Sequence, residues 1–287
     1  MVDGQLNKFK IGAIIQGRIK STRLPGKILF PLPYGSDIPL IVWPINSLKK
    51  SKLIDTIVLA TSENIENLPL NQIAIDNDIS YFAGSENNVL SRFIQASIFE
   101  KIDTIVRITG DNPIIDEKLI DQLLQMHLDG EFDYTFSKGL PLGMNIEVIQ
   151  TEKLQEISKE NDLIEADLEH VTHYFKRKKG YKILEHDYKF QSIMDLRLTI
   201  DYPSDYALFN ILSQEAIFNN LSGIELIHFL NNSKPWIFEI NKHINQKKLF
   251  VSLEEELEFS LDLLKNHDLN HTIDLLKNKI KNLWIKS

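Results

Sequence analysis

The chain has 287 residues, of which 43% are hydrophobic and 25% charged, and its formal net charge at pH 7 is -8. This composition is typical of a globular protein with enough apolar material for a core. The acidic balance argues against a general nucleic-acid binder, which needs a broad basic surface. The absence of cysteine excludes disulfides, thiolate catalysis and thiolate metal sites. The N-terminal residues lack a basic flank and an apolar stretch, and no apolar run approaches the roughly 18 residues of a membrane span, so we expect a cytoplasmic protein without a membrane partner.

The first predicted strand, Ile11 to Ile15, is an apolar run of buried-strand length that stops before Gly17. The loop after it carries four cations and closes with a Pro-Gly turn signal; the cations are Arg18, Lys20, Arg23 and Lys27. Ligands bind at the carboxyl ends of strands in open α/β sheets, and Arg and Lys together suit a polyphosphate. The alternative interpretation is a solvated basic loop.

Strand and helix patterns then alternate along the chain. Helices are predicted over residues 39–51, 88–101, 116–128 and 164–178, and strands over residues 54–61, 79–82, 103–108, 132–137 and 196–200. Such alternation indicates parallel βαβ units and therefore an α/β fold.

Two of the predicted strands end at an aspartate. Asp111 follows Gly110 beyond residues 103–108, and Asp201 follows residues 196–200 and precedes Pro203. Two carboxylates at strand ends can meet across one sheet edge, where they suit Mg²⁺ shared with substrate phosphates. The alternative is a helix cap at each position, made by Asp111 before Pro113 and by Asp201 or Ser204 at the later helix.

The amino-acid sequences of these segments resemble motifs of the cytidylyltransferases that make CMP-activated sugars. Arg18-Ile-Lys-Ser-Thr-Arg-Leu-Pro-Gly-Lys27 is similar to the signature of the Kdo and acylneuraminate enzymes, and most of all to the SpsF-type proteins of spore-coat polysaccharide synthesis. Gly110-Asp-Asn-Pro113 and Asp201-Tyr-Pro-Ser-Asp205 resemble the family's metal-binding elements. Further similar segments end at Arg92 and run from Glu169 to Thr172. The resemblance covers about residues 9 to 215.

The resemblance implies a Rossmann-like nucleotidyltransferase fold, with three α/β/α layers around a mostly parallel mixed sheet. It implies a homodimer that transfers CMP from CTP to a sugar or sugar acid with Mg²⁺ and releases pyrophosphate, for surface polysaccharide or glycoconjugate synthesis. The implied catalytic residues are Lys27, Arg18, Asp111 and Asp201, of which Asp111 and Asp201 are the metal ligands. The implied nucleotide-binding residues are Gln16, Gly17, Arg18, Ser21, Arg23, Lys27, Arg92 and Asp111. The implied acceptor-binding residues are Gly143, Asn145, Glu147 and His170, with Asn145 standing where the family usually carries Asp.

The C-terminal part differs in character. We expect a nucleotidyltransferase domain over residues 1–239 and a helical extension over residues 240–287, because leucine and isoleucine recur there at helical spacing in two stretches separated by residues 267–270. Such a helical hairpin could pack on the main domain or on a second subunit.

Two other functions compete with this interpretation. A nucleotide-sugar-dependent glycosyltransferase also places metal-binding carboxylates at strand ends. A non-catalytic relative could bind a nucleotide, or a partner protein through the helical C-terminal part. The cations of the first loop favour a triphosphate over a diphosphate sugar. The choice of cytosine over another base depends on the resemblance alone.

Overall fold

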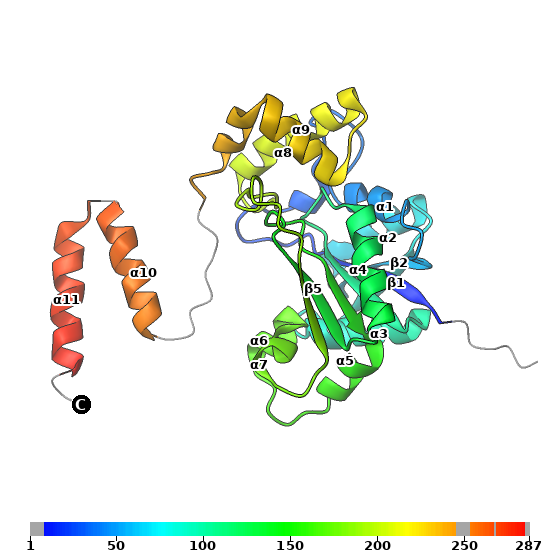
Figure 1. The fold of residues 1–287 in the computed structure, drawn as a ribbon, viewed down its shortest axis with the longest axis horizontal. Coiled ribbons are helices and arrows are strands. Elements are labelled where there is room, and N and C mark those ends of the chain that lie inside the picture. Colours follow the sequence, from blue (N-terminus) through cyan, green and yellow to red (C-terminus); the bar gives the residue numbers. More distant parts are fainter. Residues whose placement is uncertain (1–8, 245–252, 267, 285–287) are drawn as a thin grey trace, which may run out of the picture. The chain divides into compact units, whose positions relative to one another are not determined.

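The computed structural model describes residues 9–244, 253–266 and 268–284, and Figure 1 shows its elements in chain order. The N-terminal residues expected to contain no leader, and His267 in the expected helix break, lie outside the described residues. Contacts divide the chain into two units, one ending at His243 and one beginning at Ile244.

The first unit is built on a seven-stranded sheet in the order β3-β2-β1-β4-β6-β5-β7. Its strands are β1 Ile11–Gln16, β2 Thr56–Ser62, β3 Ser80–Gly84, β4 Thr104–Thr109, β5 Tyr134–Lys138, β6 Glu147–Gln150 and β7 Ile183–Asp187. Only β6 runs antiparallel to its neighbours β4 and β5, and the other pairs are parallel. The predicted mostly parallel mixed sheet is therefore confirmed.

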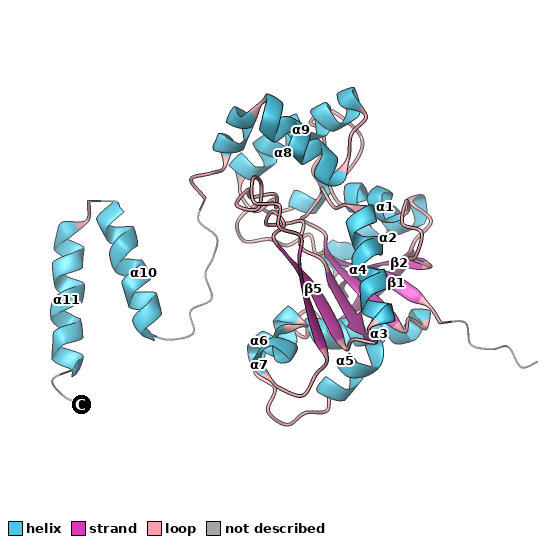
Figure 2. Cartoon of the chain, in the orientation of Figure 1, coloured by secondary structure: helices cyan, strands magenta, loops and turns pink. Residues whose placement is uncertain are grey.

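Helices surround this sheet, as Figure 2 shows. They are α1 Val42–Leu48, α2 Leu68–Asp76, α3 Val89–Glu100, α4 Glu117–Asp129, α5 Thr151–Ile157, α6 Glu165–His170, α7 His173–Arg177, α8 Pro203–Asn219 and α9 Gly223–Ser233, with short 3-10 turns η1 Lys27–Leu29, η2 Ile65–Asn67 and η3 Pro235–Ile240. Strand β1 shows why the helices form two layers. Ala13 and Ile15 point into one apolar cluster and Ile14 into the other, and all three side chains are fully buried. Burial of one such isoleucine contributes roughly 1.5–3 kcal/mol.

Two neighbouring parallel strands bring the first loop and the Gly-Asp segment together. Gln16 of β1 pairs with Thr109 of β4, and the amide of Gly110 donates to the Gln16 carbonyl over 2.7 Å. A Cβ on Gly110 would lie 2.4 Å from Ile41 Cδ1 and 3.1 Å from the Gln16 carbonyl oxygen, so a larger residue here would force the Ile41 side chain to move. The Ile200 amide then donates to the Asp111 carbonyl over 3.0 Å, which places residue 201 beside residue 111.

Two predicted elements are wrong. The single helix over residues 164–178 is broken between α6 and α7, where Val171 has a φ of +55° that cannot continue a helix. Residues 196–200 form no strand; Arg197 makes only an isolated bridge to Leu142, although this extended segment still delivers Asp201 to the sheet edge.

The second unit contains α10 Leu253–Asn266 and α11 Asn270–Trp284. The two C-terminal helices predicted from the leucine spacing are therefore confirmed. What they pack against, and a separate role for residues 240–287, stay predictions.

Candidate active site

Hydrogen bonds from backbone amides hold the loop after β1 in place, and no sequence motif predicts them. The Gly17 amide donates to the Ala60 carbonyl of β2 over 3.2 Å, and the Ile19 amide donates to Oδ1 of the buried Asn67 over 2.8 Å. Gly26 closes the loop at a left-handed φ of +75°. Lys27 comes directly after this turn and opens η1. The loop is therefore fixed at the carboxyl ends of β1 and β2.

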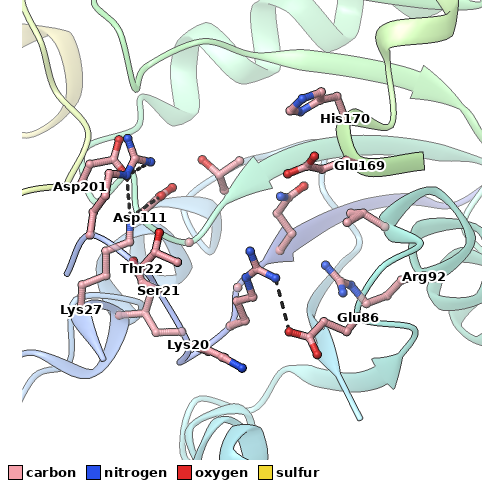
Figure 3. Close-up of a pocket in the computed structure, with 18 of the residues that line it drawn as sticks. Lys20, Ser21, Thr22, Lys27, Glu86, Arg92, Asp111, Glu169, His170 and Asp201 are labelled. Atoms are coloured by element: carbon pink, nitrogen blue, oxygen red, sulfur yellow. Dashed lines mark hydrogen bonds and ion pairs between the residues drawn. The ribbon is translucent and has the colours of Figure 1, made fainter. Parts of the chain in front are cut away.

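Lys27 joins the two predicted metal ligands. Its Nζ donates to Asp111 Oδ2 over 2.7 Å and to Asp201 Oδ1 over 3.0 Å, and it also donates to the Ile200 carbonyl. Only 6% of Lys27 is exposed. Figure 3 shows its ammonium pointing at both carboxylates. In this structure the two aspartates share its single positive charge, and its contact with the triphosphate stays a prediction.

Asp201 has two further cationic partners. Arg23 Nη2 lies 2.7 Å from its Oδ1, and Arg197 Nη2 lies 3.1 Å from its Oδ2. Arg197 is in turn held by the fully buried Asp205, whose Oδ1 accepts from Arg197 Nε over 2.9 Å. Burial would raise the pKa of Asp205, but the hydrogen bonds from Arg197 and from the Asp201 amide lower it. Asp205 therefore stays charged and fixes Arg197.

Neither predicted metal ligand serves as a helix cap. Asp116 caps α4 by accepting from the amides of Lys118 and Leu119, and Asp205 accepts from the Asp201 and Tyr202 amides at the start of α8. The capping alternative for Asp111 and Asp201 is therefore wrong.

A cavity of about 580 Å³ lies over the first loop. Most of the predicted site residues line it: Gln16, Gly17, Arg18, Ser21, Arg23, Lys27, Arg92, Asp111, His170 and Asp201. In Figure 3, Lys27 with both aspartates stands at one end, Arg92 with Glu86 at the other, and Glu169 with His170 on the facing wall. The structure thus brings these residues into one cavity; their roles stay predictions.

The Arg92 end of this cavity is positively charged. Arg92 is only 4% exposed, donates to the Ser85 carbonyl over 2.8 Å, and its Nε has no hydrogen-bond partner among the described residues. Burial, and then the charge of Arg18, lower the pKa of Arg92 to about 10, while Glu86 opposes this. Arg18 itself is half exposed and pairs with Glu86 over 3.5 Å. A buried cation with an unused donor suits an anionic or hydrogen-bonding ligand.

A second cavity of about 280 Å³ adjoins the first and is lined by the remaining predicted residues, Gly143, Asn145 and Glu147. The two cavities share the side chains of Arg107, Thr109, Asp111 and Asp201. Gly143 has a φ of +101°, and a Cβ there would lie 1.9 Å from the Leu198 carbonyl oxygen. Its missing side chain lets the loop after β5 pass against the segment that carries Asp201.

Glu147 was expected to contact the acceptor, but in this structure protein groups already surround its carboxylate. It pairs with Arg107, accepts from Tyr134 over 2.5 Å and Thr172 over 2.8 Å, and lies 3.3 Å from Lys176 Nζ. Burial would raise the pKa of Glu147, but Arg107 and Lys176 and the hydrogen bonds together lower it to about 2. The bond to Thr172 also ties β6 to the break between α6 and α7, two residues beyond His170.

Sequence reasoning missed several residues that shape this site. Asn67, Glu86 and Tyr134 were not singled out, and each acts through a partner 13 or more positions away in the chain. Asp205 stands in a motif that the sequence shows, but its contact with Arg197 was not expected. The positive φ of Val171, which turns the chain after His170, also had no signal in the sequence.

The donor set at Asp111 and Asp201 fits a hard cation. No group of three or more His, Cys, Asp or Glu side chains that could hold a metal occurs in the part of the chain that the structure describes. Mg²⁺ commonly takes only one or two carboxylates and completes its shell with water and substrate phosphates. The two aspartates, both within 3.0 Å of one ammonium nitrogen, already gather around a single positive charge.

The fold and the strand-end site define a nucleotidyltransferase, and comparison with known proteins gives the family. A model of the cytidylyltransferase family matches residues 12–251, and the chain belongs to this family. It is therefore a CTP-dependent nucleotidyltransferase. The spore coat polysaccharide biosynthesis protein SpsF of Bacillus subtilis (strain 168) is 37% identical over 225 residues, which cover 77% of this chain and 93% of that protein.

Two further relatives cover the chain to different extents. The 3-deoxy-manno-octulosonate cytidylyltransferase of Bdellovibrio bacteriovorus is 34% identical over 127 residues, or 42% of this chain and 47% of that protein. A solved cytidylyltransferase structure from Leptospira borgpetersenii serovar Hardjo-bovis has a TM-score of 0.72 and 29% identity, and the match covers 84% of this chain and 100% of that one. Within the described residues, no helix is long and apolar enough to cross a membrane.

Proposed function

We propose that this protein transfers CMP from CTP to a hydroxyl group of a sugar or sugar acid and releases pyrophosphate. The observation that carries the proposal is the shared wall of the two cavities, where Asp111 and Asp201 face both. A nucleotide in the larger cavity and an acceptor in the smaller one would meet at these carboxylates.

The chain's own residues would act mainly by positioning and by charge. The triphosphate would lie over the first loop, within reach of Arg18, Arg23 and Lys27, and the base near Gln16 and Gly17. The acceptor oxygen forms a bond to the α-phosphorus as the bond from that phosphorus to the bridging oxygen of the β-phosphate breaks. The hydroxyl proton passes to solvent, and pyrophosphate leaves with the bridging oxygen. Such a transfer needs alignment and charge neutralisation rather than covalent chemistry by the protein.

Asp111 and Asp201 would hold Mg²⁺. When bound there, the ion supplies positive charge to the phosphate oxygens. Asp205 fixes Arg197, and Arg197 in turn holds the Asp201 carboxylate in its place between the two cavities.

The relatives support a sugar-acid acceptor as the first class to test, because one of them is named for 3-deoxy-manno-octulosonate. SpsF is named for spore coat polysaccharide synthesis, which supports a role in surface polysaccharides or glycoconjugates. Dimerisation and a cytoplasmic location stay predictions.

Pyrophosphate release tests the proposal. The protein is incubated with Mg²⁺, each of the four nucleoside triphosphates, and a panel of 3-deoxy sugar acids, nonulosonic acids and sugar phosphates. We expect release only with CTP and only with one acceptor class. Transfer from a preformed nucleotide sugar, without pyrophosphate release from CTP, would support the glycosyltransferase instead. CTP binding without turnover on any acceptor would support the non-catalytic relative.

A further inference from the structure

We propose that Lys27 keeps divalent cations away from Asp111 and Asp201 in the free protein, so that the metal binds only together with the triphosphate. The inference rests on the proposed function for the identity of the nucleotide. The claim that Lys27 blocks the metal in the nucleotide-free protein depends only on the structure.

The carboxylates at the shared wall are already matched by cations. Lys27 bonds both Asp111 and Asp201, Arg23 pairs with Asp201, and Arg197 lies between Asp201 and Asp205. Each negative charge of this cluster thus has a positive partner. A site without net negative charge gives a divalent cation little electrostatic reason to leave water.

The ammonium of Lys27 also stands where an ion would stand. Its Nζ lies 2.7 Å from Asp111 Oδ2 and 3.0 Å from Asp201 Oδ1. Mg²⁺ needs its oxygen ligands at about 2.0–2.1 Å, so an ion that uses both aspartates would overlap the ammonium. The metal and the ammonium of Lys27 therefore compete for the same two oxygens.

Lys27 is held firmly in this position. Its side chain is 8% exposed, and the Ile200 carbonyl accepts a third hydrogen bond from it. Pulling this buried ammonium away from its partners without a substitute is costly, because its own charge and that of Asp111 then lose their ion pair. In the part of the chain that the structure describes, the hydrogen bonds of Lys27 Nζ go to these three acceptors.

A bound triphosphate would supply that substitute. Lys27 and Arg23 both line the larger cavity, where the phosphates are proposed to lie. The four-carbon stem of lysine can rotate its point charge toward phosphate oxygens, which releases the carboxylates. Because binding coupling is reciprocal, the nucleotide raises metal affinity by the same factor as the metal raises nucleotide affinity.

Mn²⁺ alone serves as the probe, and its free concentration is measured by electron paramagnetic resonance. The unaltered protein is compared with Lys27→Met, which keeps an unbranched side chain one atom shorter and removes its charge. Lys20→Met is the matched control, since Lys20 lines the same cavity and its side chain is exposed. Far-UV circular dichroism confirms that each variant is folded.

We expect Lys27→Met to bind Mn²⁺ without nucleotide about tenfold or more tightly than the unaltered protein, and Lys20→Met to show no such gain. The double variant Lys27→Met with Asp201→Asn should lose that gain. Equal or weaker Mn²⁺ binding by Lys27→Met would overturn the inference, because Lys27 would then merely hold the carboxylates in place.

A second experiment measures Mn²⁺ binding to the unaltered protein with and without CTP. Saturating CTP without acceptor should increase Mn²⁺ binding to the protein about tenfold or more, beyond binding to CTP itself, and Lys27→Met should show little further increase. Equal Mn²⁺ affinity of the unaltered protein with and without bound CTP would also overturn the inference. Failure of CTP to bind at all would instead count against the proposed function, while the comparison with Mn²⁺ alone would still decide the role of Lys27.

Discussion

Replacing Glu147 with glutamine removes the negative charge that holds Arg107 and Lys176 beside the smaller cavity. The side chains of Glu147 and Arg107 are only 12% and 16% exposed, so water cannot replace the lost charge. The glutamine keeps the shape of the side chain, and the change therefore isolates the charge.

The structure sets the size of the effect. The pKa of Glu147 falls from 4.5 to about 2, and each unit corresponds to about 1.4 kcal/mol of differential interaction, so the charged form is favoured by about 3 kcal/mol. Removal of one partner of a buried ion pair costs about 3–5 kcal/mol in other proteins. We therefore expect the free energy of unfolding to fall by about 3 kcal/mol in Glu147→Gln.

Urea unfolding followed by far-UV circular dichroism measures this loss. Glu185→Gln is the matched control, because Glu185 pairs with Lys138 over 2.7 Å with both side chains about half exposed, and such a surface pair contributes at most about 1 kcal/mol. A loss below about 1 kcal/mol in Glu147→Gln, or an equal loss in both variants, would refute this reasoning.

The same charge makes stability depend on pH. The pKa of Glu147 is lowered in the folded state, so its contribution is fully present above pH 4.5 and is lost as the pH falls toward 2. Between these values the unaltered protein should lose more stability than Glu147→Gln, by about 3 kcal/mol.

Three further substitutions test other parts of the site. Gly143→Ala should lower the free energy of unfolding by more than about 2 kcal/mol, because its Cβ would lie 1.9 Å from the Leu198 oxygen at a φ of +101°; an unchanged urea midpoint would contradict this. Arg92→Met should weaken CTP binding about tenfold by calorimetry, since it removes a buried donor at the end of the larger cavity, and an unchanged dissociation constant would count against that placement. Thr172→Val should cost about 1 kcal/mol of stability and raise the acceptor KM more than the CTP KM, because the 2.8 Å bond to Glu147 holds the chain beyond His170; equal KM changes would argue against this link.

The parts of the fold that could be predicted from sequence are those with a local signal. The apolar run of β1 and the glycine after it indicate a buried strand and a turn, and the Gly110-Asp111 pair indicates a strand end. These signals sufficed for the parallel βαβ pattern and for the edge of the sheet at which the site lies.

The parts that could not be predicted depend on contacts between distant residues. The ammonium of Lys27 meets Asp201 across 174 positions of sequence, and nothing near either residue encodes that distance. Glu147 on a strand face looks solvated until β4, β5 and α7 place Arg107, Tyr134 and Lys176 around it.

The two wrong elements have the same cause. Residues 196–200 alternate like a strand, but their long-range backbone-to-backbone hydrogen bonds go to Leu142 and Asp111, which lie in loops, so the segment makes one isolated bridge, at Arg197. Residues 164–178 have helical composition throughout, and the break at Val171 coincides with the tie between Thr172 and Glu147. In both places tertiary contacts outweigh local propensity.

The central claim is that Asp111 and Asp201 form the reaction centre between two cavities. It is tested most directly by pyrophosphate release from CTP, with Mg²⁺ and the accepted sugar, in the unaltered protein and in Asp111→Ala. We expect the variant to stay folded by circular dichroism and to lose turnover by about a hundredfold or more. A folded Asp111→Ala variant that releases pyrophosphate at the unaltered rate would contradict the account.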